Sequence, residues 1–100
     1  MLEKKAQDVV LLETGKVSII ADYFLIGTGI SRVQIQAICD HLRRQIKEIG
    51  FSPLRIEGYR EGSWVLMDYG SLVIHLFQPQ AREFYNLERL WGRALLVERF

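Results

Sequence analysis

The fold of this chain is decided by the stretch Glu61-Gly62-Ser63-Trp64-Val65-Leu66-Met67-Asp68-Tyr69-Gly70-Ser71-Leu72-Val73-Ile74-His75-Leu76-Phe77. Two β-type runs meet there at a polar break that contains glycine. Such a break is typical of a short hairpin loop. We predict that Tyr69 and Gly70 form the loop, and this register pairs Trp64 with His75.

The two faces of this hairpin differ in composition, because side chains alternate between the faces of a strand. One face is purely aliphatic and is expected in the core: Val65, Met67, Leu72, Ile74 and Leu76. The other face mixes aromatic and polar groups: Trp64, Leu66, Asp68, Ser71, Val73, His75 and Phe77. The mixed face is therefore the first candidate for function.

Composition limits the classes of protein that fit. One hundred residues, 49% of them hydrophobic, predict a single domain over residues 1–100 with a small core. The formal charge of +1 disfavours nucleic acid as the direct ligand and leaves it at most a peripheral contact. The single Cys39 cannot form an internal disulfide, and no apolar run reaches the length of a membrane span. We therefore expect a cytoplasmic protein that binds no membrane.

The rest of the chain adds helices and further strands. We predict strands at 8–12, 23–26 and 54–57, a helix from Ser31 that Gly50 and Pro53 end, and a second helix from Pro79 to Gly92. Strands and helices in this order predict an α/β fold, a mixed five-stranded sheet with packed helices. The passage 23–57 should be a parallel crossover. The apolar tail 93–100 has no predicted place.

The first helix carries an apolar stripe at helical spacing: Ile35, Ile38, Cys39, Leu42, Ile46 and Ile49. This stripe is expected to lie on the sheet. Helical spacing and strand alternation together predict that six side chains are buried: Ile38, Leu42, Ile46, Val65, Ile74 and Leu76.

Residues that could carry catalysis lack the partners they would need. The turn 27–31 could hold an anion at a helix N-terminus, or it could only cap the helix. A nucleotidyltransferase metal site needs two acids on one strand, yet Arg55 stands where a partner for Glu57 should be. The histidines and Cys39 lack metal-ligand spacing. We predict no enzyme, no cofactor and no metal ion.

Several motifs across roughly residues 5–91 occur together in one order. They are Asp8-Val9-Val10-Leu11-Leu12, Asp22-Tyr23-Phe24-Leu25-Ile26-Gly27-Thr28-Gly29, Glu57-Gly58, Trp64-Val65-Leu66-Met67-Asp68-Tyr69-Gly70, Val73-Ile74-His75-Leu76-Phe77, Arg82-Glu83-Phe84-Tyr85 and Leu87-Glu88-Arg89-Leu90-Trp91. In this order the motifs resemble the Iojap family, the ribosomal silencing factors. The resemblance implies a nucleotidyltransferase-like fold without catalysis.

The resemblance also implies a function and a partner. Members of the family bind protein number fourteen of the large ribosomal subunit and block subunit joining, and so repress translation. They act in the cytoplasm, or in an organellar stroma or matrix if the source is eukaryotic. Members usually begin with a helix before the first strand, and because only residues 1–7 precede the first predicted strand we expect that helix to be missing or nearly so. The bare sheet face would favour a homodimer, which the family also implies.

The mixed hairpin face and the start of the second helix coincide with the densest part of the resemblance. They also carry Trp, Tyr and Arg, the residue types that dominate binding energy at protein interfaces. We predict that the partner-binding residues are Trp64, Asp68, Tyr69, His75, Arg82 and Tyr85. The same aromatics could instead seal the helix against the sheet. A vestigial nucleotide-handling protein and a self-associating scaffold remain as alternative functions.

Overall fold

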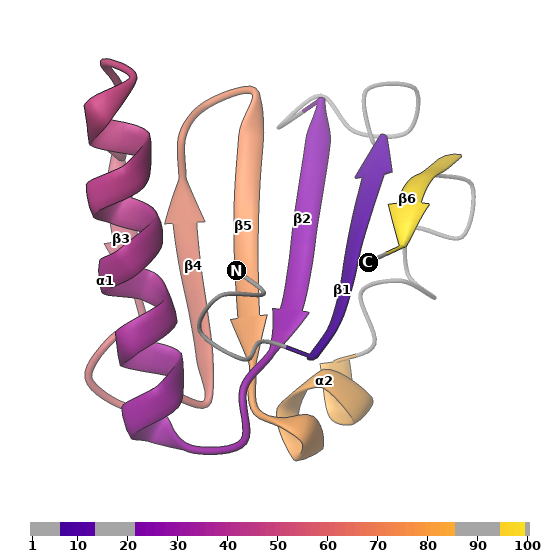
Figure 1. Ribbon diagram of the computed structural model, residues 1–100. Coiled ribbons are helices and arrows are strands. Elements are labelled where there is room, and N and C mark those ends of the chain that lie inside the picture. Colours follow the sequence, from indigo (N-terminus) through magenta and orange to yellow (C-terminus); the bar gives the residue numbers. More distant parts are fainter. Residues whose placement is uncertain (1–6, 14–21, 86–94, 100) are drawn as a thin grey trace.

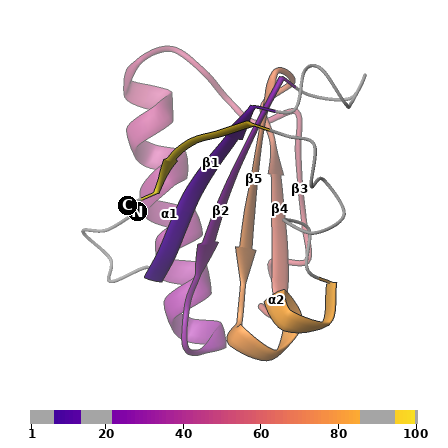
Figure 2. The same cartoon turned by 90° about the vertical axis from the view of Figure 1, so that its right-hand side faces the viewer.

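The computed structural model describes residues 7–13, 22–85 and 95–99 (Figure 1). In chain order the elements are β1 (Gln7–Glu13), β2 (Tyr23–Thr28), α1 (Arg32–Glu48), β3 (Arg55–Glu57), β4 (Trp64–Asp68), β5 (Leu72–Phe77), α2 (Pro79–Tyr85) and β6 (Leu95–Arg99). The strands form one sheet in the order β3-β4-β5-β2-β1-β6. Figure 2 shows α1 on one side of this sheet and α2 near its end on the other side.

The sheet is mixed, as predicted. The pair β2 and β5 is parallel, and all the other pairs are antiparallel. After the crossover through α1, β3 runs in the same direction as β2. The two strands are not neighbours, because β5 and β4 lie between them. All five predicted strands are present. The tail adds a sixth strand, β6, which pairs with β1 and makes β1 an interior strand.

The hairpin forms with a loop one residue later than predicted. Trp64 pairs with Phe77 rather than with His75, and the backbone N–H of Tyr69 donates to the carbonyl of Leu72 over 2.9 Å. The predicted loop Tyr69-Gly70 is therefore wrong, and Gly70-Ser71 forms it. Gly70 has φ +88°, which suits the first central position of a type II′ turn. The pairing partner of each residue shifts by two positions. Side chains alternate between faces with a period of two, so each face keeps its predicted members.

Helix α1 is closed at both ends by its own sequence. The Ser31 hydroxyl accepts from the backbone N–H of Gln34 over 3.1 Å, as predicted for an N-cap. The Gln34 side chain reaches one residue further back than in a capping box, and accepts from the N–H of Ile30. At the other end Gly50 (φ +98°) and Phe51 donate to the carbonyls of Lys47 and Ile46, which is a Schellman motif. These caps fix where the helix enters and leaves the sheet.

The core lies on both faces of the sheet. Between α1 and the sheet the buried cluster contains Val9, Ile35, Ile38, Cys39, Leu42, Val65, Met67, Ile74 and Leu76. On the opposite face a smaller cluster contains Val10, Phe24, Ile26, Val73 and Phe77. Of the six predicted core residues, five are buried and Ile46 is partly buried. Ile49 does not join them and is 72% exposed, because α1 ends there in its C-cap.

In the loop from β3 to β4, the backbone at Gly58 passes close to the backbone of Trp64. Gly58 has φ +79°, and a Cβ at this position would overlap the carbonyl oxygen of Trp64. We expect Gly58→Ala to lower the free energy of unfolding by about 2 kcal/mol, through backbone strain and overlap together. Urea unfolding measures this loss. In Gly50→Ala the added Cβ meets nothing within 4 Å, so this control should lose only about 1 kcal/mol. Equal losses in the two variants would contradict the overlap.

Candidate partner-binding site

Trp64 begins β4 on the face of the sheet opposite α1. Its ring stacks on Phe77 with 5.2 Å between the centroids, and its Nε1–H donates to Nδ1 of His75 over 3.1 Å. Two contacts hold the indole in one orientation, yet Trp64 is only partly buried. A large aromatic side chain that is fixed before binding loses little conformational entropy on binding, so Trp64 has the properties of an interface anchor.

His75 supports Trp64 from β5. It is only 4% exposed, and its ring packs edge-on against Phe24. Burial lowers its pKa from 6.5 to about 4. Because Nδ1 accepts the indole hydrogen bond, the neutral ring carries its proton on Nε2, which finds no partner among the described residues. Protonation would place a second donor against the indole N–H, so the contact requires the neutral form.

The buried His75 predicts a loss of stability in mild acid. Its folded pKa lies below its unfolded pKa, so the unfolded state binds more protons between these two values. Stability should therefore fall as pH drops from 6.5 toward 4, by about 2 kcal/mol at pH 5. Urea unfolding at pH 7 and pH 5 measures this difference. The control is His75→Asn, whose side-chain oxygen can still accept from the indole. A parent protein with the same pH dependence as this variant would contradict the prediction.

Arg82 lies at the same end of the sheet as Trp64. Its guanidinium Nη1 donates to the hydroxyl of Thr28, at the end of β2, over 2.7 Å. Thr28 and Phe77 are neighbours across the parallel pair, and Phe77 is the partner of Trp64. Trp64, His75 and Arg82 therefore belong to one end of one sheet face.

The other predicted residues are placed apart from this group. Asp68 ends β4 at its far end, where its carboxylate accepts from the N–H of Gly70 over 2.8 Å and from Arg55 Nε over 3.3 Å. Tyr69 packs against the core beneath α1, on the other face of the sheet. Burial raises the pKa of its hydroxyl. Tyr85 ends α2, and its side chain lies outside the described residues.

The glycine turn before α1 uses its backbone donors within the chain. The N–H of Gly29 donates to the carbonyl of Phe77, and the N–H of Ile30 donates to the Gln34 side chain. These two groups are engaged, so the geometry favours the structural role of this turn over an anion site.

The acids that a nucleotidyltransferase would need are not assembled in the described residues. Glu57 forms an ion pair with Arg55 over 3.5 Å, and both side chains are more than half exposed. No group of three or more His, Cys, Asp or Glu side chains in the ranges 7–13, 22–85 and 95–99 could hold one metal ion.

A groove that the sequence did not predict lies between α1 and β3. Its volume is about 320 Å³, and its walls are Cys39, Asp40, Arg43, Ile56 and Tyr59. The Tyr59 hydroxyl lies 3.0 Å from both oxygens of Asp40, a hydrogen bond that raises the pKa of this tyrosine. Burial raises the pKa of the Cys39 thiol to about 11, so the thiol stays protonated at neutral pH.

Known proteins match this chain along nearly its whole length. The family model described as "Ribosomal silencing factor during starvation" matches residues 1–99. A ribosomal silencing factor from Halalkalibacterium halodurans is 47% identical, over 96% of this chain and 82% of its own length. "Protein Iojap, chloroplastic" from Zea mays is 38% identical, over 96% of this chain and 42% of its own length.

A solved structure agrees with these matches. The crystal structure of a protein from Chromobacterium violaceum covers 91% of this chain and 76% of its own, with 33% identity and a TM-score of 0.88. No helix among the described residues is long and apolar enough to span a membrane. The similarity in sequence and the agreement in fold lead to one assignment: this chain belongs to the family of ribosomal silencing factors.

Proposed function

We propose that this protein represses translation by binding protein number fourteen of the large ribosomal subunit, where it blocks the joining of the small subunit. A role in the regulation of translation follows from the family. The proposed mechanism is steric. A domain that is already bound at the subunit interface occupies volume that the second subunit needs, and this requires no catalytic turnover.

The observation that carries the proposal is the fixed, partly exposed indole of Trp64. It is held by His75 and Phe77, and Arg82 lies at the same end of the sheet. Trp and Arg at one site are typical of the few residues that supply most of the binding energy at an interface. The formal charge of +1 supports contact through a shaped patch, since the chain has little excess positive charge to attract RNA phosphates.

Sedimentation with purified ribosomal subunits tests the proposal. The protein is expected to sediment with large subunits and to remain in the supernatant with small subunits. When both subunits are mixed under joining conditions, an excess of the protein should reduce the fraction of joined ribosomes. Binding to small subunits alone, or joining that is unchanged at saturating protein, would contradict the mechanism.

The two alternative functions make different predictions. A nucleotide-handling enzyme should transfer label from a nucleoside triphosphate in the presence of divalent metal. We expect no product above the blank, because Arg55 pairs with Glu57 where a second acid would stand. A self-associating scaffold should keep its function when exposed hairpin residues are changed. We also propose that the protein forms a homodimer, and that it acts in the compartment that holds its ribosomes, which is the cytoplasm in a bacterium.

A further inference from the structure

We propose that the groove between α1 and β3 binds an extended peptide segment that carries an acidic side chain and an apolar side chain two residues apart, on the same face of the peptide. This groove lies apart from Trp64, whose side chain is on the opposite face of the sheet. The proposal therefore does not rest on the ribosomal contact.

In the part of the chain that the structure describes, the groove is lined by one acid, Asp40, whose carboxylate is already hydrogen-bonded, and by one cation, Arg43, whose donors are available. The Asp40 carboxylate is occupied by the Tyr59 hydroxyl, 3.0 Å from each of its oxygens. The Cys39 side chain is buried beneath the groove. Arg43 lines the groove and makes no hydrogen bond or ion pair with any residue in the described ranges. A ligand that pairs with the Arg43 guanidinium must carry an anionic group. A carboxylate suits this role because it can accept two parallel hydrogen bonds from a guanidinium.

The wall opposite Arg43 is apolar and already in place. Ile56 is partly buried against the core, and Tyr59 is 37% exposed. Tyr59 is fixed at two points, since its hydroxyl is bound to Asp40 and its carbonyl accepts from Gln36 Nε2 over 2.9 Å. A wall that is ordered before binding reduces the entropy cost of binding. The groove can therefore receive one apolar side chain next to the group that reaches Arg43.

The backbone beside the groove is the free edge of the sheet. β3 is the terminal strand and pairs only with β4 in the described sheet, so its outer edge presents backbone groups that an added strand could pair with. Figure 1 shows β3 behind α1 at this margin. Because side chains alternate, Ile56 faces the groove while Arg55 and Glu57 face away and pair with each other. An added strand would send alternate side chains into the groove.

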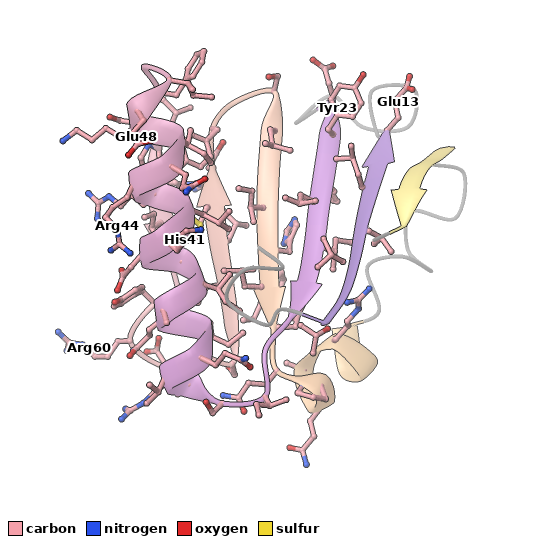
Figure 3. The ribbon with its side chains drawn as sticks, viewed as in Figure 1. Glu13, Tyr23, His41, Arg44, Glu48 and Arg60 are labelled. Carbon is pink, nitrogen blue, oxygen red and sulfur yellow. The ribbon has the colours of Figure 1, made fainter. Side chains whose placement is uncertain are left out.

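The surroundings favour an acidic partner. Arg44 and Lys47 are exposed on α1 near Arg43, and Figure 3 shows Arg44 pointing away from the sheet. Together with Arg43 these cations outnumber the two acids of this stretch of α1, Asp40 and Glu48, and the excess positive charge attracts acidic segments and repels basic ones. A peptide fits better than the phosphate backbone of a nucleic acid, because Arg43 is the one cation among the described residues that line the groove, and a phosphate chain cannot pair with a strand edge.

The test uses the full chain and a fluorescein-labelled peptide of about eight residues, in which leucine and glutamate alternate with threonine. Fluorescence anisotropy should show saturable binding. Arg43→Glu should weaken it by about tenfold or more, since it removes a charged hydrogen-bond donor from the groove. The matched control is Arg44→Glu, which makes the same change in charge one residue away and outside the groove, and should weaken binding less than about threefold. Thermal unfolding checks that both variants are folded.

Two changes to the probe test the strand pairing and the charge. A peptide with N-methylated alternate amides should bind at least about tenfold more weakly, because it cannot donate to the edge of β3. Lysine in place of glutamate should abolish binding. Backbone amide shifts in NMR spectra should be confined to β3, the residues around Tyr59 and the groove face of α1. Four results would overturn the proposal: no saturable binding, equal effects of Arg43→Glu and Arg44→Glu, full binding of the methylated peptide, or equally tight binding of polyuridylate.

Discussion

Truncation of Ile38 to alanine is expected to lower the free energy of unfolding by about 2–5 kcal/mol. Ile38 is 0% exposed and lies in the middle of α1, where it packs among Val65, Ile74 and Leu76 from the hairpin. The truncation removes the hydrophobic free energy that burial of these atoms contributes. It also leaves a cavity that the surrounding strands can fill only in part. In a domain of this size the melting temperature should fall by about 8 °C or more. Thermal and urea unfolding of the same sample measure both quantities.

Ile49→Ala is the matched control for this prediction. The residue type and the helix are the same, but Ile49 is 72% exposed at the C-cap of α1. Its truncation should change stability by no more than about 0.5 kcal/mol. Equal losses at Ile38 and Ile49 would show that α1 is not seated on the sheet as the structure describes.

Much of the fold could be predicted because its signals are local. The alternation of side chains in the hairpin and the spacing of apolar residues in α1 each identify one inward face, and both faces meet in the core. Ile49 shows the limit of this reasoning. The apolar spacing continues to Ile49, while the Gly50 turn ends the helix there, so periodicity alone does not locate the end of the contact.

Pairings between distant parts of the chain were harder to predict. β6 pairs with β1 from the other end of the chain, and no local pattern in the tail identifies that partner. The hairpin register also depended on a detail of the turn. Gly70 takes the first central position instead of the second, which moves the loop by one residue and leaves Tyr69 paired with Leu72.

The part of the candidate site that lies within the hairpin could be predicted. Strand alternation and the pairing of the two hairpin strands place Trp64 and His75 on one face, and the structure adds the hydrogen bond between them. The same alternation, continued from Met67, would have placed Tyr69 beneath α1. The groove was missed because Arg43 and Tyr59 come from separate elements, and only the crossover through α1 brings them together.

Trp64→Ala is expected to weaken binding to large ribosomal subunits by about 2 kcal/mol or more, which is an increase of about thirtyfold or more in the dissociation constant. The indole is the largest partly exposed side chain of the proposed contact, and Phe77 and His75 hold it in place before binding. The truncation also removes contacts within the protein, so stability and binding must be measured separately. Thermal unfolding establishes the fraction that is folded, and sedimentation at a temperature well below the transition gives the dissociation constant. Tyr85→Ala should likewise weaken binding if Tyr85 is a second anchor.

Two controls separate an anchor from a structural residue. Trp64→Phe keeps a ring that can stack on Phe77 but deletes the donor to His75, so it should lose less binding than Trp64→Ala. Lys47→Ala lies on the exposed side of α1 and should leave both stability and binding unchanged. A Trp64→Ala protein that is folded and binds like the parent would show that this surface is not the contact. The outer face of α1, with Arg32, Gln36 and Arg43, would then be the next surface to test, because exposed cations lie along it.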